Sequence, residues 1–181
     1  MTIGIRRWRM EDAQSLAEAL NNKTIHENLR DGLPFPYTVS DAEAYISDML
    51  SADRDKTYAW AITVDDVAVG SIGAFRRDNV HRFTAEMGYY LAEEYWGQGI
   101  VTRAIELACR YLFEHTDIVR IFAEPYAHNV ASCRVLEKAG FVYEGTLRKN
   151  AVKNGRLVDI KLYAILGCDF NSAECRVEIT S

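Results

Sequence analysis

Several features are scarce in this 181-residue chain, and each scarcity excludes a class of protein. No apolar run approaches the ~20 residues of a membrane span. Charged residues interrupt the N-terminus too early for a signal peptide. Basic residues are outnumbered by acidic ones, and the net charge of −5 disfavours nucleic acid as the principal partner and mildly favours cationic partners. We therefore expect a cytoplasmic protein with no membrane partner and no direct nucleic-acid partner.

Metal-binding and disulfide patterns are also missing. The four histidines are scattered and the four cysteines form no C-x-x-C, so we expect no metal. The thiols are predicted to be free and mostly buried. With 49% hydrophobic residues the chain can bury one good core, and we expect a single domain over residues 1–181. The cysteines are Cys109, Cys133, Cys168 and Cys175.

The most informative stretch begins at Glu86. Apolar and aromatic residues alternate with other residues from Glu86 to Leu91, which predicts a buried strand. A helix is predicted from Val101, because apolar residues recur at offsets of 3, 4, 7 and 11 and so share one helical face. The apolar positions of this helix are Val101, Ala104, Ile105, Ala108 and Leu112.

Two glycines, Gly97 and Gly99, stand at the mouth of the predicted helix. They allow a tight loop that aims several backbone N–H groups at one point, and the helix dipole adds about half a positive charge there. This geometry suits a phosphate, although a Gly-x-Gly is often only a turn. A P-loop is excluded because no Gly-Lys-Ser/Thr follows, and a Rossmann loop is excluded because Thr102 occupies the place of its third glycine.

At these residues the sequence resembles the GNAT superfamily of N-acetyltransferases, in particular the branch of ribosomal-protein N-terminal (alanine/serine) acetyltransferases. The superfamily motif for acetyl-CoA is Q/R-x-x-G-x-G/A. In this chain Trp96 to Val101 occupies it: Gly99 matches, while Trp96 and Val101 depart from the usual residues. The sequence Tyr-Trp-Gly-x-Gly is common in this branch. Val101, in contrast, leaves less room for a close phosphate contact.

A second motif, from Asn129 to Phe141, matches the branch form N-x-x-S-x-x-x-x-E-K-x-G-F at every fixed position. The two motifs occur in the expected order and at the expected separation. The resemblance covers about residues 3–166, which is nearly the whole chain.

The resemblance implies the acyl-CoA N-acyltransferase fold, an α+β fold in α/β/α layers. The predicted elements are strands near 3–8, 57–64, 67–75, 86–91, 119–126, 141–144 and 156–166, with helices near 11–20, 23–29, 40–50, 101–112 and 130–139. Their order does not alternate strictly, so we expect a mixed, mostly antiparallel sheet with helices on both faces. The third helix is predicted to be capped by Ser40 or Asp41, with a capping box from Ser40 to Glu43.

In the resembling family the fourth and fifth strands splay apart and receive the pantetheine arm of the cofactor. Met87–Leu91 would then offer backbone hydrogen bonds, Gly97–Thr102 would hold the pyrophosphate, and Asn129 with Ser132 would reach the pantetheine from the other side. The residues implied at acetyl-CoA are Met87, Tyr89, Tyr90, Leu91, Gly97, Gln98, Gly99, Ile100, Val101, Thr102, Asn129 and Ser132.

The implied reaction is direct transfer of an acetyl group from acetyl-CoA to an amine. An ammonium must lose a proton first: a lysine amine is only ~0.04% neutral at pH 7 and an α-amine roughly a tenth neutral. Glu86 matches the position of the glutamate base in the histone acetyltransferases of the superfamily. Equally, Glu86 could be structural, in an ion pair with Arg82 or Arg120.

The leaving thiolate needs a proton donor. Many family members place a tyrosine one residue before the E-K-x-G-F glutamate, but this chain has Leu136 there. In this branch the serine of N-x-x-S, Ser132, is the usual substitute, and it could instead serve only the helix. Other candidates left unassigned are Tyr90, Tyr143 and Tyr163.

The acceptor site is implied to border the loop at residues 30–37, where Phe35 and Tyr37 are candidates for substrate contact or for core packing. A protein N-terminal amine is the first expected acceptor, ahead of small amines, polyamines and antibiotics. Two alternatives are a noncatalytic acyl-CoA-binding regulatory domain and a structural protein whose glycines form an ordinary turn. A homodimer is left open.

Overall fold

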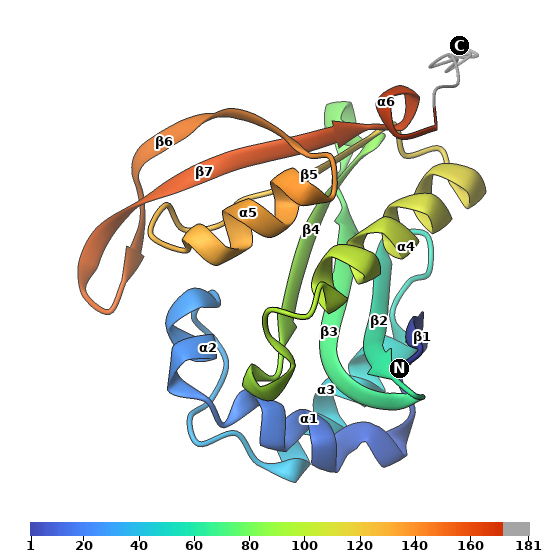
Figure 1. Cartoon of the computed structure of the whole chain (residues 1–181), viewed down its shortest axis with the longest axis vertical. Helices are drawn as coiled ribbons and strands as arrows, with labels where there is room; N and C mark the ends of the chain where they lie inside the picture. The colour runs from blue at the N-terminus through green and yellow to red at the C-terminus, as the bar shows by residue number, and fades with distance from the viewer. Residues whose placement is uncertain (172–181) are drawn as a thin grey trace.

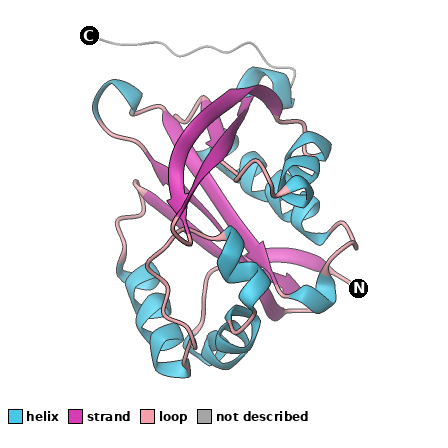
Figure 2. Cartoon of the chain, turned by 90° about the vertical axis from the view of Figure 1, so that its left-hand side faces the viewer, coloured by secondary structure: helices cyan, strands magenta, loops and turns pink. Residues whose placement is uncertain are grey.

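A computed structural model of the protein describes residues 1–171, which form one seven-stranded sheet with helices on both faces (Figures 1 and 2). The strand order across the sheet is β1-β2-β3-β4-β5-β7-β6. Neighbouring strands are antiparallel except β4 and β5, which are parallel. The strands are β1 (Ile3–Arg6), β2 (Thr57–Val64), β3 (Val67–Arg76), β4 (Thr84–Leu91), β5 (Arg120–Ala123), β6 (Val142–Lys153) and β7 (Arg156–Leu166).

The helices divide between the two faces of the sheet. Three short 3-10 turns accompany them at Met10–Asp12, Asn79–His81 and Glu93–Tyr95. The α-helices are α1 (Ala13–Leu20), α2 (Lys23–Asn28), α3 (Val39–Ser51), α4 (Ile100–His115), α5 (Val130–Lys138) and α6 (Gly167–Asn171). These findings confirm the prediction of a mixed, mostly antiparallel sheet with helices on both faces.

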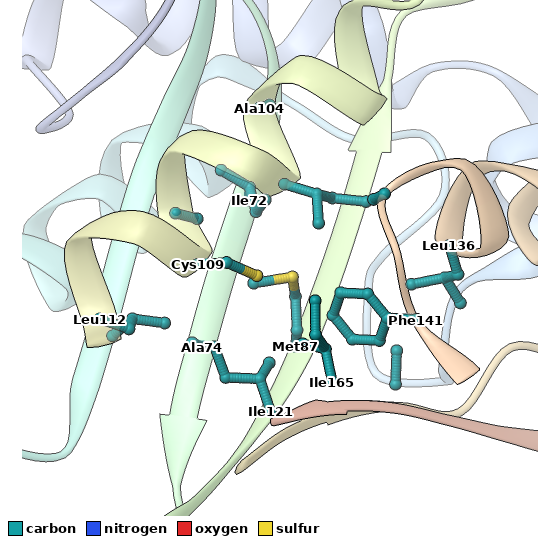
Figure 3. Close-up of a cluster of buried hydrophobic side chains, with 14 of the residues drawn as sticks. Ile72, Ala74, Met87, Ala104, Cys109, Leu112, Ile121, Leu136, Phe141 and Ile165 are labelled. Atoms are coloured by element: carbon teal, nitrogen blue, oxygen red, sulfur yellow. The ribbon is translucent and has the colours of Figure 1, made fainter. Parts of the chain in front are cut away.

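Two separate apolar cores hold the layers together. The larger core packs α4 and α5 against the sheet, and Figure 3 shows Met87 of β4 and Cys109 of α4 pointing toward one another within it. The smaller core packs α1 and α3 against the other face, around residues such as Leu16 and Ile46. Successive residues of a strand point to opposite faces. Met87 therefore lies in the larger core, whereas Tyr90 packs against the smaller one.

The parallel strands β4 and β5 stay together only briefly. Their pairing runs from Thr84 opposite Arg120 to Glu86 opposite Phe122 and then ends. From Met87 onward β4 keeps only its partner β3. The predicted splay between the fourth and fifth strands is therefore confirmed.

Glycine permits a close backbone approach in the middle of the sheet. A Cβ at Gly70 of β3 would lie 2.4 Å from the carbonyl oxygen of Tyr90 in β4. The register between β2 and β3 also shifts at Ile62/Thr63, opposite this glycine. Glycine at this position therefore accommodates both a bulge and a close backbone approach.

The cap predicted for the third helix was wrong. Helix α3 begins at Val39, and Thr38 is its N-cap in extended conformation. The Thr38 hydroxyl accepts a hydrogen bond from the Asp41 N–H at 3.2 Å, and the Asp41 carboxylate accepts one from the Thr38 N–H at 2.8 Å. This is a capping box two residues earlier than expected, with aspartate in place of glutamate.

Several strand boundaries also differ from the prediction. β1 ends at Arg6 and β5 at Ala123, both earlier than the pattern indicated. The strand predicted near 141–144 does not end there but continues as one long strand, β6, which forms a hairpin with β7. Its register against β7 shifts between Tyr143/Gly145 and Leu147/Ala151. The turn between β6 and β7 is formed by Asn154 and Gly155, which both have positive φ.

Candidate functional site

The free edge of β4 lies at the centre of the molecule. Met87 and Leu91 have buried side chains, so a ligand between the splayed strands would meet their backbone. The Leu91 carbonyl already accepts a hydrogen bond from Trp96 Nε1 at 2.7 Å. Trp96 thereby ties the loop after β4 to the end of the strand.

The loop before α4 is built for backbone donors. Gly97 and Gly99 have φ values of 73° and 76°, a left-handed conformation that glycine adopts without strain. A Cβ at either position would meet no atom within 4 Å, so conformation and open space explain the glycines. The first backbone bond of the helix runs from Arg103 N–H to Gly99 O at 3.1 Å. The N–H groups of the first turn before Arg103 therefore have no acceptor within the helix.

The remaining residues of this loop have different roles. Ile100 is buried in the larger core, while Val101 is half-buried against it. Gln98 donates from Nε2 to the Glu94 carbonyl at 3.1 Å. Together with the helix dipole, these contacts leave a positively polarised, solvent-facing turn that fits a pyrophosphate.

The second motif forms the N-terminus of α5. Asn129 is the N-cap, and its Oδ1 accepts a hydrogen bond from the Ser132 N–H at 3.1 Å. The Ser132 hydroxyl lies 2.8 Å from the Tyr89 hydroxyl, which also donates to the Ser132 carbonyl at 3.3 Å. Burial raises the pKa of Tyr89 well above its ordinary value, so this phenol stays protonated. The structure thus brings together Tyr89 of β4 and Ser132 of α5, a contact that the sequence did not indicate.

The other tyrosines considered as acids lie elsewhere. Tyr163 is buried and donates to Glu137 at 2.8 Å, which fastens α5 to β7. Tyr143 is exposed and bonds Thr146 at 2.6 Å within its own strand. Tyr90 packs on the opposite face from Ser132, and burial raises its pKa well above the ordinary value.

Glu86 makes two ion pairs. Arg30, which follows α2, donates to one carboxylate oxygen of Glu86, and Arg77 reaches the other at 3.3 Å. The sequence had suggested Arg82 or Arg120 as partners of Glu86, and neither of them is a partner in the structure. Arg120 instead pairs with Glu144 of β6. Glu86 lies on the face of the sheet opposite to Tyr89, because the two residues are three apart in one strand.

A second carboxylate, Glu124, lies on the same face. Glu86 pairs with Phe122, and Glu124 follows Phe122 by two residues, so its side chain points to the side where Glu86 lies. Arg30 donates to it at 3.3 Å. Burial raises the pKa of Glu124 above its ordinary value, the charge of Glu86 adds to this effect, and Arg30 and Arg77 oppose it.

Glu124 opens onto a pocket of about 370 Å³. The pocket lies between α2 and the β6–β7 hairpin, which face each other in Figure 1. No motif in the sequence indicates this carboxylate, which only continues the alternation of Arg120 and Phe122 with the apolar residues between them. The residues lining the pocket are Asn28, Arg30, Asp31, Glu124, Tyr126, Asn150, Ala151, Val152 and Ile160.

The two aromatic candidates for substrate contact have opposite environments. Phe35 is 58% exposed, and its ring centroid lies 4.9 Å from that of His26. Tyr37 is buried in the smaller core, and its hydroxyl donates to the Asp41 carbonyl at 3.3 Å. Burial raises the pKa of Tyr37 to about 12. Tyr37 therefore takes the core-packing alternative, whereas Phe35 is free to meet a ligand.

Residues 1–171 also bear on metal binding, membrane spans and the thiols. In this part of the chain no cluster of His, Cys, Asp and Glu is suited to a metal ion. The same residues include no helix long and apolar enough to cross a membrane. Cys109 and Cys133 are buried free thiols, as predicted, and Cys175 lies outside the described residues.

Comparison with known proteins agrees with this geometry. Residues 2–142 match the family model described as "Acetyltransferase (GNAT) domain". The chain is 36% identical over 136 residues to probable N-acetyltransferase YjcK of Bacillus subtilis, covering 74% of this chain and 75% of that protein. It is 30% identical over 100 residues to the ribosomal-protein-serine acetyltransferase of Escherichia coli, covering 55% of each.

A solved structure shares the fold over nearly the full length of both chains. It is the spermidine N-acetyltransferase of Vibrio cholerae in complex with CoA and spermine, which has a TM-score of 0.77 and 22% identity. The match covers 93% of this chain and 97% of that one.

Proposed function

This chain belongs to the GNAT family of acetyl-CoA-dependent N-acetyltransferases, and on that premise we propose that it acetylates a protein N-terminal amine by direct transfer. The observation that carries the proposal is the placement of two groups on opposite faces of one splayed strand. Tyr89 and Ser132 lie on the side of α4 and α5, whereas Glu86 and Glu124 lie on the side of α2. The family relationship gives no support to the noncatalytic alternative.

Acetyl-CoA would be bound mainly by backbone groups. The free N–H groups between Gly97 and Thr102 suit the pyrophosphate, and the unpaired edge of Met87–Leu91 suits the amide groups of pantetheine. Bound acetyl-CoA supplies a thioester whose carbonyl carbon the acceptor amine attacks. A backbone N–H near Tyr90 or Leu91 would stabilise the oxyanion that forms there.

At the sulfur, Ser132 is the proposed proton donor. Tyr89 remains protonated and has a single O–H. When that proton is donated to Ser132 Oγ rather than to the Ser132 carbonyl, the serine proton is free to point away, toward the splay. Leu136, at the position of the usual tyrosine, is fully buried and contributes nothing to this chemistry. The serine therefore replaces that tyrosine as the donor to the leaving thiolate.

Charge balance favours an N-terminal amine over a polyamine. Around the acceptor pocket Glu86 and Glu124 face Arg30 and Arg77, and Asp31 pairs with Lys153 at 2.6 Å. Three acidic and three basic groups leave no net local charge to attract a polycation. A peptide that carries one ammonium has no such requirement. Polyamines and other small amines are accordingly the second candidate class.

Thiol release from acetyl-CoA tests this proposal against a matched panel. The panel contains an unblocked Ser-Ala-Ala-Ala peptide amide, its N-acetylated form, an N-acetylated lysine peptide and spermidine. We expect release with the unblocked peptide, none with the blocked peptide, and slower release with the ε-amine or with spermidine. Faster release with spermidine would favour the second class. Absence of release with every amine would contradict the proposal.

A further inference from the structure

The two carboxylates at the acceptor side differ in what already binds them. Glu86 is held by two arginines, with one guanidinium on each of its oxygens. It does not line the pocket that Asn28 and Glu124 share. Glu124 has a single, longer contact to Arg30, at 3.3 Å, and it lines the pocket of about 370 Å³. Of the two groups, Glu124 is the less tightly paired and the one that lines this pocket, with 22% of its side chain exposed against 15% for Glu86.

A second polar group in this pocket lacks a partner. Asn28 of α2 lines the pocket, and its Oδ1 is buried without a hydrogen bond to any described residue. The amide orientation is fixed, because its Nδ2 donates to the Thr24 carbonyl at 2.9 Å. The atom left over is therefore an acceptor. A buried acceptor without a donor is costly, and a ligand that brings N–H groups would satisfy it.

We propose that Glu124 receives the ammonium of the acceptor, together with Asn28 Oδ1, and takes the first proton from it. This inference rests on the proposed function and assigns the base to Glu124, whereas the family resemblance pointed to Glu86. Glu124 lies just past the step where β4 and β5 part, so the amine that it binds enters beside the opening that suits the thioester. Glu86 then fixes Arg30 and Arg77 around the pocket.

The proton balance of this step is simple. One proton passes from the acceptor ammonium to the Glu124 carboxylate and leaves a neutral amine. The amine nitrogen forms a bond to the thioester carbonyl carbon, and the carbon–sulfur bond breaks. The nitrogen loses its second proton, and the departing sulfur gains one from Ser132, which is restored by the proton that the nitrogen releases. Glu124 returns its proton to solvent through the open pocket.

The charges around Glu124 suit this task. Glu86 faces it from β4, Arg77 from the segment after β3, Arg30 and Asp31 from the segment after α2, and Lys153 is paired with Asp31. Burial and Glu86 raise the pKa of Glu124, which makes its carboxylate a stronger base than an exposed one. Arg30 is 67% exposed, and exposed ion pairs are weak, so an ammonium can displace it.

Rates measured against pH for two glutamine variants test the assignment. With the unblocked peptide amide, Glu124→Gln should lower kcat/KM about 10- to 100-fold at pH 7. The loss should shrink above about pH 9, where the α-amine is already neutral. Glu86→Gln should give a smaller loss and should move the acid limb of the profile to lower pH, because removing this charge lowers the pKa of Glu124. Glu114→Gln, on the exposed end of α4, is the matched control.

The reverse pattern would overturn the proposal. If Glu86→Gln shows the loss that high pH restores, while Glu124→Gln only shifts the profile, then Glu86 is the base. Glu124→Asp keeps the charge and should recover part of the rate with the wild-type form of the pH profile. This variant decides the matter if the glutamine variant folds poorly.

Equilibrium binding separates this inference from the proposed function. The peptide amide is titrated into the CoA-bound protein, and the Asn28 side-chain amide signal is followed by NMR. We expect a shift in the wild type and in Glu86→Gln, and none in Glu124→Gln. This result needs no turnover, so it stands even if the peptide is not acetylated. Equal shifts in all three proteins would contradict the role of Glu124.

Discussion

The two sides of strand β4 are built in different ways. On the α4 and α5 side, the loop from Gly97 to Thr102 presents backbone groups, and Asn129 caps the helix that carries Ser132. On the α2 side, the groups come from three separate segments, which carry Glu86, Glu124, and Asn28 with Arg30, and they act through side chains. The cofactor side thus depends on contiguous motifs, and the acceptor side depends on long-range packing.

This difference has a functional meaning. A cofactor common to a whole family can be bound by backbone groups that any sequence with the right conformation supplies. An acceptor that differs between relatives must be selected by side chains. Variants on the first side should therefore change affinity for CoA, and variants on the second should change the acceptor or the pH dependence.

The largest effect is expected at Gly99. Gly99→Asp places a negative charge where the pyrophosphate fits, and repulsion of this kind should weaken CoA binding on the order of 100- to 1,000-fold. Gly99→Asn is the matched control, since asparagine has the same shape and tolerates positive φ equally well. Calorimetric titration of CoA into both variants measures the difference. Equal affinities would show that the phosphate does not bind at this turn.

The second-largest effect is expected at Ser132. Ser132→Ala should lower kcat by roughly 10- to 100-fold, because the thiolate leaves without its proton. Tyr89→Phe should lower kcat by less, and it should have no further effect in the Ser132→Ala background, because it acts only through Ser132. A double-mutant cycle on kcat measures this coupling. Multiplicative effects would contradict the positioning role of Tyr89.

A smaller effect is expected at Arg30. Arg30 lowers the pKa of Glu124, so Arg30→Ala should raise that pKa, and the ionised base should appear at higher pH. The acid limb of kcat/KM should move upward by less than about one pH unit, as befits an exposed ion pair. Arg110→Ala, which removes the same charge from an ion pair on α4, is the control and should leave the limb in place.

The smallest effects separate Phe35 from Tyr37. Phe35→Ala removes an exposed ring that contacts His26 of α2, and we expect it to raise the KM of the acceptor a few-fold without changing CoA affinity. Tyr37→Phe removes one weak hydrogen bond in the core and should cost less than about 1 kcal/mol of stability without changing KM. Steady-state kinetics and urea unfolding check the pair. A KM change at Tyr37 would return it to the substrate site.

The sequence predicted the helices and the glycine turn of the proposed cofactor side, and the reason is physical. Helix periodicity from Val101, the glycines at 97 and 99, and the Asn129 cap are all local signals. The order of elements and the splay of β4 and β5 followed from them and from the family resemblance. The early start of α3 was missed because Thr38 with Asp41 competes locally with Ser40 and Glu43 for the same cap.

The groups on the α2 side could not be predicted from local sequence signals. The partners of Glu86 are Arg30, 56 residues away, and Arg77, so no local spacing indicates them. Asn28 and Glu124 line one pocket because α2, the end of β5 and the β6–β7 hairpin border the same space. The alternation that continues from β5 puts Glu124 on one face of the sheet. Only the observed register of β4 against β5 shows that Glu86 lies on the same face.

Backbone amide NMR of this 20.5 kDa protein tests the separation of the two sides most directly. CoA is titrated first, and the unblocked peptide amide is then added to the CoA complex. We predict that CoA shifts the amides of Met87–Leu91 and Gly97–Thr102 and leaves Asn28 and Ala151 in place, and that the peptide then shifts the second pair. Shifts at the pocket caused by CoA alone, with none at Gly97–Thr102, would contradict the account.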